Sequence, residues 1–316
     1  CQRVPKLTML LAEAAVNTQN GAFRDFTMTE DELYELKIAA WLHDCGKVTT
    51  PEHIMDKATK LETIFDRVHL IDTRFELLKA QEENKYLMQA LNAANAGQSV
   101  NLKQLRYDIK SVKKRLDDDK NFIRKVNFGS ESMRPEDQQR VKDIASYEYV
   151  NDAGHKVKFL SDDEVHCLTI TRGTLTPEER QVINNHIVVT INMLESLPYP
   201  EHLKRVPEYA GGHHERMDGK GYPKGLKREQ MSVPARMMGV ADIFEDLTSK
   251  DRPYKKAKTL SETLAILARM KREHHIDPDV FELFIRERIY LKYAEEFLDP
   301  EQIDYVDEEA ILRDGV

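Results

Sequence analysis

The stretch Thr29–Lys47 reads TEDELYELKIAAWLHDCGK and joins a helix signal to a run of reactive side chains. Thr29 followed three residues later by Glu32 is typical of a capping box, which predicts a helix over 30–43. Apolar residues recur with helical spacing from Leu33 to Leu42. The predicted helix therefore ends on the polar run His43–Lys47.

The same helical period recurs along most of the chain, and strand signals are almost absent. A second capping box, Thr176 with Glu179, predicts another helix start, and Lys156–Leu160 is one weak strand candidate. The fold class is therefore predicted to be all-α. The other predicted helices cover 3–16, 61–92, 101–126, 177–196, 233–249, 260–273 and 278–298.

Residues 75–172 differ from the sequence on either side. Two stretches with heptad-like apolar spacing flank the turn-like run Asn95–Ser99, which predicts an antiparallel helical hairpin. The expected division is a first catalytic part at 1–74, a mostly helical insertion at 75–172, a second catalytic part at 173–298 and a C-terminal tail at 299–316. The insertion is either a surface addition without a catalytic role or an arm for dimerisation or signal relay.

Composition limits the class of protein. With 316 residues, 41% hydrophobic and 32% charged, the chain predicts a globular, helix-rich protein. A net charge of −8 argues against binding of a nucleic acid polymer, and the sequence contains no apolar run long enough to cross a bilayer. Three scattered cysteines favour a cytoplasmic, reducing location. Because the chain starts at Cys1, we expect a fragment without membrane contact of its own, whose full-length protein could carry an upstream sensor or anchor.

The run His43–Lys47 brings a ring nitrogen and a carboxylate within one turn. Asp44 could bridge two cations and His43 could bind one, while Lys47 could contact a phosphate. The alternative is an ordinary helix end, with Gly46 as its cap and the charges in water.

A second stretch, His213–Pro223, joins two consecutive histidines to a glycine-rich loop, HHERMDGKGYP. Gly219 and Gly221 allow the loop to approach a ligand closely and to present Tyr222 at a fixed angle. The alternative is a plain surface loop with incidental histidines.

Two single residues complete the candidate set. Asp242 has apolar neighbours on a predicted helix, and a buried carboxylate there needs a partner or a metal. His186 lies on another predicted helix with apolar neighbours. Either could instead be an ordinary surface or core residue. Six nitrogen and carboxylate ligands without thiolates point to two or more divalent transition metals, with Fe or Mn first and Zn or Ni as alternatives. The candidate ligands are His43, Asp44, His186, His213, His214 and Asp242.

These motifs together resemble the HD-GYP family of cyclic-di-GMP phosphodiesterases over residues 1–70 and 173–298. His43–Lys47 resembles the family motif HDxGK, and His213–Leu226 resembles the family motif HHExxDGxGYPxGL. VADxFxxLTS matches Val240–Ser249, RPYK matches Arg252–Lys255, and the DPxxxxxF segment matches Asp277, Pro278 and Phe284.

The resemblance implies an HD-superfamily helical bundle that uses a metal-bridging hydroxide to hydrolyse cyclic-di-GMP to linear pGpG or as far as GMP. It implies the six metal ligands above and catalytic roles for Asp44 and Lys47. A homodimer or an upstream sensor domain is the expected partner besides the cyclic dinucleotide. The implied substrate contacts are Gly221, Tyr222, Pro223, Arg252 and Lys255.

The chain departs from the family pattern at three points. Ligands expected on the first helix would precede Cys1, His69 competes with His186 for one ligand position, and Ser249–Asp251 is one residue longer than usual. We prefer His186, because its spacing to His213 is close to that of the family. Alternative functions are the same chemistry on cyclic GMP-AMP, a signalling module that binds the dinucleotide without hydrolysis, and a structural helical scaffold.

Overall fold

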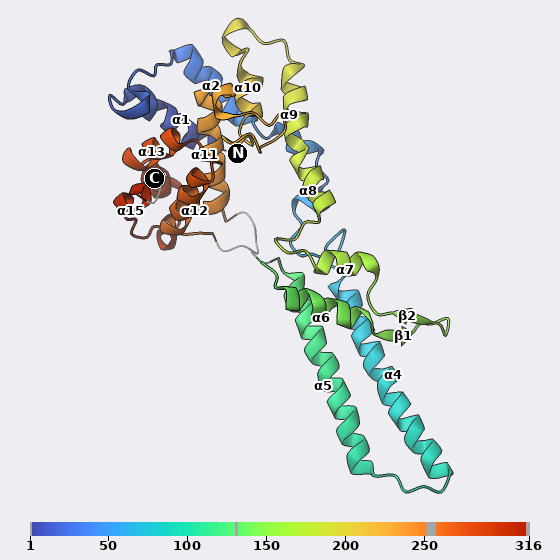
Figure 1. Cartoon of the computed structure of the whole chain (residues 1–316). Coiled ribbons are helices and arrows are strands. Elements are labelled where there is room, and N and C mark those ends of the chain that lie inside the picture. The colour runs from blue at the N-terminus through green and yellow to red at the C-terminus, as the bar shows by residue number, and fades with distance from the viewer. Residues whose placement is uncertain (1, 130–131, 251–256, 314–316) are drawn as a thin grey trace. The chain divides into compact units, whose positions relative to one another are not determined.

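The computed structural model of the chain describes residues 2–129, 132–250 and 257–313 (Figure 1). By its internal contacts the chain divides into two compact units, one formed by Cys1–Thr50 with Val182–Val316 and the other by Pro51–Gln181. We call them the histidine unit and the arm unit. Both are dominated by helices, as the periodicity predicts. No helix of the described chain has the length and apolar content needed to cross a membrane.

The histidine unit is a helical bundle. Its α-helices are α1 (Arg3–Asn17), α2 (Glu30–Leu42), α9 (His186–Glu195), α10 (Val206–Gly211), α11 (Val233–Thr248), α12 (Leu260–Arg272), α13 (Pro278–Arg286), α14 (Ile289–Phe297) and α15 (Glu308–Arg313). Short 3-10 turns lie at η1 (Gly21–Phe23), η2 (Cys45–Thr49), η3 (Glu201–Leu203), η4 (Arg228–Gln230) and η5 (Pro300–Gln302). Helix α8 (Pro177–Asn184) contains the boundary between the units.

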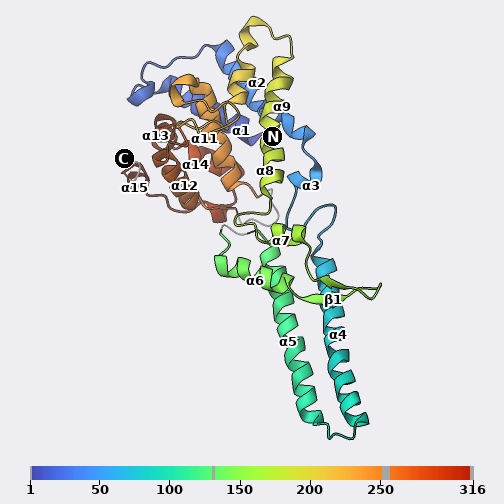
Figure 2. The same ribbon diagram turned by 45° about the vertical axis from the view of Figure 1, so that its right-hand side comes forward.

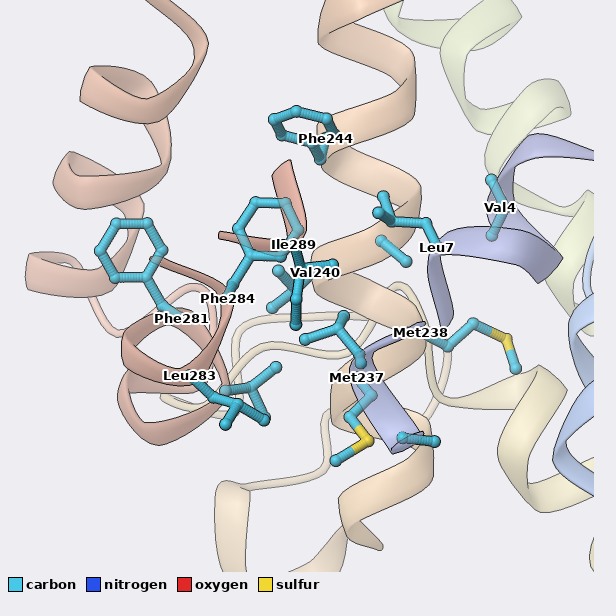
Figure 3. Close-up of a cluster of buried hydrophobic side chains, with 14 of the residues drawn as sticks. Val4, Leu7, Met237, Met238, Val240, Phe244, Phe281, Leu283, Phe284 and Ile289 are labelled. Carbon is cyan, nitrogen blue, oxygen red and sulfur yellow. The ribbon is translucent and has the colours of Figure 1, made fainter. Parts of the chain in front are cut away.

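Helix α11 lies at the centre of this bundle. Figure 3 shows Val240 and Phe244 of α11 among apolar side chains of α1, α13 and α14. The Phe244 ring meets the Phe284 ring edge to face, with 5.0 Å between centroids. This core fixes α11, and with it the position of Asp242.

The arm unit is built on two long helices, α4 (Val68–Asn95) and α5 (Leu102–Asn127), which run side by side in Figure 1 and Figure 2. Ion pairs give their antiparallel register: Arg124–Asp72, Lys120–Glu76, Lys79–Asp117 and Lys113–Glu83. In each pair, the two residues lie equally far along the chain from the turn between the helices. The remaining elements are α3 (Glu52–Met55), α6 (Pro135–Ala145), α7 (Asp162–Leu168) and the strands β1 (Glu148–Val150) and β2 (Lys156–Lys158).

Several predicted boundaries need correction. The helix expected from 61 begins at Val68, because the Asp66 carboxylate accepts the Val68 amide at 2.9 Å and holds the preceding residues in a turn. The helix expected over 177–196 is interrupted at Asn185, next to the point where the Ile183 carbonyl faces the His186 ring. The helix expected over 278–298 breaks before α14, where Arg288 adopts a left-handed φ of 50°.

Other expectations agree with the structure. Both predicted capping boxes form: Thr29 with Glu32, and Thr176 with Glu179. The weak strand candidate contains β2, which pairs antiparallel with β1. The arm unit contains the expected insertion at 75–172, and its hydrophobic core also includes Leu61, Val68 and Ile71.

Candidate metal centre

Four segments of the histidine unit bring six sequence-predicted ligands together. His43 and Asp44 follow α2, His186 begins α9, His213 and His214 follow α10, and Asp242 lies on α11. Asp44 is the common neighbour. Its Oδ1 lies 3.2 Å from His186 Nε2 and 4.0 Å from His213 Nε2, and its Oδ2 lies 3.2 Å from His43 Nε2. The two carboxylate oxygens thus face different histidines.

The remaining two ligand candidates extend the cluster on either side. Asp242 Oδ1 lies 3.5 Å from His43 Nε2, and His214 Nε2 lies 3.2 Å from His186 Nε2. Two groups of three have ligand atoms within 4.8 Å of one another: His186, His213 and His214, and His43, Asp44 and His213. A metal ion would need such convergence of nitrogen and oxygen atoms.

Backbone carbonyls orient three of the rings. The Nδ1 atoms of His43, His186 and His213 lie 2.7, 2.6 and 2.7 Å from the carbonyl oxygens of Ala40, Ile183 and Ala210. Each carbonyl precedes its histidine by three residues, so the Nδ1 proton is donated to the backbone. In the neutral ring, Nε2 then carries the lone pair and points into the cluster, which is the arrangement that metal-binding histidines use.

Buried polar atoms without partners mark the same place. His43 Nε2, His213 Nε2 and Asp44 Oδ1 are buried and have no hydrogen-bond partner. An unsatisfied buried polar atom costs about 1–3 kcal/mol, so three of them side by side are expensive unless a ligand satisfies them. The residues therefore fit a bound cation.

Electrostatics favour the same interpretation. Burial lowers the pKa of His213 to about 4 and that of His214 to about 2, so both rings are neutral at pH 7 and can donate lone pairs. Burial also opposes the charge on His43, but the carboxylates of Asp242 and Asp44 outweigh it and raise the pKa of His43 to about 10. A cation bound between these carboxylates would displace that proton.

Both carboxyls are held ionised in spite of burial. Burial alone would raise the pKa of Asp44, but His186 and His43 hold it well below its usual range. For Asp242, His43 again outweighs burial and the pKa is lowered. Two charged carboxylates within a ring of imidazoles are a hard-and-borderline donor set that suits divalent transition metals.

Lys47 lies at the edge of the cluster. Its Nζ lies 2.6 Å from Asp44 Oδ2, and its side chain is 41% exposed, so the ammonium can face a ligand that arrives from solvent. The structure thus brings Lys47 beside Asp44, and its expected contact with a phosphate stays a prediction.

Gly46 has a role that the sequence did not indicate. It was considered as a helix cap, but a side chain here would place a Cβ 2.1 Å from the His186 carbonyl oxygen and 2.6 Å from the Thr190 amide. The Gly46 amide also donates to Thr190 Oγ1 at 2.9 Å. Gly46 therefore allows η2 and α9 to touch, which sets the distance between Asp44 and His186. A glycine two residues after an Asp ligand is the one sequence signal for this contact.

The loop after His214 is closed by Glu215, whose part the sequence analysis also missed. The buried Glu215 carboxylate accepts the amides of Lys224 and Leu226, both at 2.8 Å. Gly221 lies against the backbone of Glu215 and Arg216, where a Cβ would come within 2.3 Å of an amide nitrogen. Within this closed loop the Tyr222 ring stacks on His214, with 4.8 Å between centroids, and Pro223 follows through a cis peptide bond.

The other candidates lie elsewhere. His69 is an exposed residue of α4 in the arm unit, and it belongs to neither metal-ligand group. Arg252 and Lys255 lie outside the described residues, so their expected substrate contacts stay predictions.

Comparisons with known proteins agree with this geometry. Residues 162–280 match the HD domain family, and this range contains His186, His213, His214 and Asp242. A probable cyclic di-GMP phosphodiesterase of Vibrio cholerae is 36% identical over 135 residues, which are 41% of this chain and 30% of that protein. A cyclic di-GMP phosphodiesterase of Thermotoga maritima is 35% identical over 114 residues, 36% of this chain and 30% of that protein.

A third relative differs in its named substrate. A 3′3′-cGAMP-specific phosphodiesterase of Vibrio cholerae is 40% identical over 81 residues, 26% of this chain and 19% of that protein. The chain thus spans less than a third of the length of these curated relatives. The helical bundle and its His-Asp cluster define an HD domain with a candidate metal site. Together with the HDxGK and GYP motifs, the family match and the named relatives support an HD-GYP domain.

Proposed function

We propose that this chain is a metal-dependent phosphodiesterase that hydrolyses cyclic-di-GMP to linear pGpG or as far as GMP. The observation that carries the proposal is the convergence of ring nitrogens and carboxylate oxygens from four separate segments, in which His43 Nε2, His213 Nε2 and Asp44 Oδ1 have no hydrogen-bond partner. The names of the Vibrio and Thermotoga relatives support the choice of substrate.

The donor set supports two divalent ions, Fe or Mn first and Zn or Ni as alternatives. His186 and His214 would hold one ion and His43 and Asp242 the other, with Asp44 and His213 next to both groups. Such ions, when bound, polarise a phosphodiester and lower the pKa of a water molecule.

The chain's own side chains would bind and orient the substrate. In the reaction, a water oxygen bonds to phosphorus, the phosphorus–O3′ bond breaks and the departing oxygen takes a proton. Lys47 would donate a hydrogen bond to a phosphate oxygen, because its ammonium is the cation nearest to Asp44. The loop of Gly221, Tyr222 and Pro223 would border the substrate, with Tyr222 stacked beside the ligand candidate His214.

Further parts of the proposal rest on the sequence. Arg252 and Lys255 would contact phosphate or guanine, and residues 75–172 would be an insertion between two catalytic parts at 1–74 and 173–298. The cytoplasmic location, and a homodimer or upstream sensor as partner, stay predictions of the same kind.

Hydrolysis of cyclic GMP-AMP is the second candidate activity, and it is supported by the name of the third relative. The chemistry at phosphorus would be the same, and only recognition of one base would differ. A module that binds either dinucleotide without turnover is the alternative from another class.

The test is to purify the 316-residue chain without oxygen, to measure bound metals, and to follow linear product from each dinucleotide separately. We expect two or more transition-metal ions per chain and turnover of at least one substrate. Asp44→Ala should abolish turnover and lower metal content. Asp31→Ala is the matched control, because Asp31 is an exposed residue in the first turn of the same helix, α2.

Product formation by Asp44→Ala at the wild-type rate would overturn the proposed role of Asp44. Tight binding of a dinucleotide by the metal-loaded wild type, without product, would favour the signalling module.

A further inference from the structure

The two halves of the α4–α5 hairpin differ in how their apolar side chains are covered. Near the rest of the arm unit, Phe75 and Leu78 of α4 and Leu116 and Ile123 of α5 are buried in the core. Towards the turn, Leu87, Leu91 and Leu102 are 46%, 51% and 63% exposed. Figure 1 shows that α4 and α5 continue as a bare pair beyond α6, α7 and the strands. We call this part, residues 82–115, the distal hairpin.

The distal hairpin contains an apolar groove of about 480 Å³ between its two helices. Leucines, an isoleucine and charged side chains line it. The lining residues are Glu83, Leu87, Leu102, Leu105, Arg106, Ile109, Lys110 and Lys113. A groove of this composition would bury apolar surface if an occupant supplied the missing side.

Charge on the rim is unbalanced. Glu83 is the one acidic lining residue, and it already pairs with Lys113 at 2.6 Å. In the described part of the chain, no ion pair involves Arg106 or Lys110. Residues 102–115 carry six basic side chains and one acidic side chain, within a chain of net charge −8. The cations next to the groove are therefore available to an anionic partner.

We propose that the distal hairpin binds an acidic amphipathic helix of another protein. An elongated groove between antiparallel helices accepts a third helix, whose apolar stripe would pack on Leu87, Leu105 and Ile109. Carboxylates beside that stripe would pair with Arg106 and Lys110. This proposal does not depend on the metal centre or on the proposed activity.

Two other occupants fit less well. A second copy of the chain, packed groove to groove, would bring the unpaired Arg106 and Lys110 side chains of both copies together, and like charges disfavour that contact. A lipid surface would favour long apolar residues at the tip. The turn between α4 and α5 reads Ala96-Gly-Gln-Ser-Val-Asn101, which is polar and small apart from Val100.

The experiment uses the whole chain and a synthetic peptide of about 20 residues, with leucines at i, i+3, i+4 and i+7 and glutamates elsewhere. A second peptide has lysine in place of each glutamate. We expect the glutamate peptide to bind with a Kd on the order of 10 µM, to become helical, and to bind more weakly as salt rises. The lysine peptide should bind at least about tenfold more weakly.

Matched charge reversals test the position of the site. Arg106→Glu with Lys110→Glu should weaken binding of the glutamate peptide at least about tenfold and strengthen binding of the lysine peptide. The control, Lys103→Glu with Lys114→Glu, makes the same change of charge at exposed residues that do not line the groove, and it should have little effect. Circular dichroism of each variant checks that the hairpin stays folded. Leu87→Ser supplies a test without change of charge and should also weaken binding.

Three results would overturn the proposal. Equal loss of binding in both double variants would show general attraction of charges rather than a groove. Concentration-dependent dimers of the wild type that the groove variants abolish would assign the surface to a second copy. Absence of peptide binding together with binding to vesicles of phosphatidylglycerol and phosphatidylcholine would assign it to a lipid surface.

Discussion

The two units differ in whether every buried polar side-chain atom of the described residues has a hydrogen-bond partner. In the arm unit, buried charges have partners: Glu164 receives two hydrogen bonds from Arg74, and Lys57 pairs with Glu179 at 2.7 Å. Among the described residues of that unit, no buried side-chain nitrogen or oxygen lacks a hydrogen-bond partner. In the histidine unit, unpartnered atoms of His43, Asp44 and His213 cluster instead. The comparison teaches that buried polar atoms with partners support a fold, whereas buried polar atoms without partners, gathered in one place, indicate a ligand site.

The largest expected effect concerns the cluster of candidate metal ligands in the histidine unit. His213 adjoins both groups of candidate ligands, so His213→Ala should lower metal content and reduce turnover on the order of a thousandfold. Metal analysis and product assays measure both. His202→Ala, at an exposed histidine of η3 in the same unit, should change neither. Full metal content in the His213 variant would contradict the assignment.

A variant that breaks a buried ion pair of the arm unit should lose stability and keep its bound metal. Arg74→Met leaves the Glu164 carboxylate buried without its partner, which should lower the free energy of unfolding of the arm unit by about 3–5 kcal/mol. Hydrogen exchange in α7 under increasing urea measures this. Arg124→Met breaks an exposed pair with Asp72 and should cost at most about 1 kcal/mol. Equal losses would mean that burial of the pair does not matter.

Removal of metal should lower the stability of the histidine unit and leave that of the arm unit unchanged. If the ions are present at about 100 times their Kd, a chelator should lower the free energy of unfolding of the histidine unit by about 3 kcal/mol for each ion removed. The arm unit should keep its stability, because its buried polar atoms need no ion. Hydrogen exchange with and without chelator reports on each unit separately. An equal change of hydrogen exchange in α4 and α5 of the arm unit would contradict this prediction.

The smallest expected effect is a change of stability with pH that arises from Lys60. Its buried ammonium donates to the carbonyls of Leu168 and Ile170 without a carboxylate partner, and burial lowers the pKa of Lys60 from 10.5 to about 8. Because the unfolded chain keeps the proton to higher pH, stability should rise as pH increases from about 8 to 10.5. Relative to Lys60→Met, we expect a gain of about 1–3 kcal/mol between pH 7 and pH 10, measured by urea unfolding. An increase in stability as the pH falls would contradict a lowered pKa of Lys60.

The sequence predicts helices well, because helical periodicity and capping boxes are local signals. Thr29 with Glu32 starts α2 as expected, and α5 lies within one residue of the predicted 101–126. Breaks are harder to predict, because they depend on side chains that are distant or unusual in conformation. The turn before Val68 needs the Asp66 carboxylate, which also accepts from Asn127 far along the chain. The break before α14 needs a left-handed Arg288.

The site is predictable in its residue types and much less so in its geometry. Motifs indicate His43, Asp44, His213, His214 and Asp242, but no pattern states that three Nδ1 atoms face carbonyls three residues earlier. The close approach at Gly46 depends on α9, which follows some 140 residues later and so leaves only a weak local trace. Long-range contact is the part of the site that residue spacing does not encode.

The matched register of α4 and α5 makes the hairpin adjustable in length. Since the ion pairs join residues equally far from the turn, removal of one heptad from each helix near the turn would leave every pair from Arg124–Asp72 to Lys113–Glu83 in register. Removal from one helix alone would slide like charges against each other. Evolution or an engineer could therefore shorten the hairpin, and delete its groove, while the ion pairs nearer the core stay as they are.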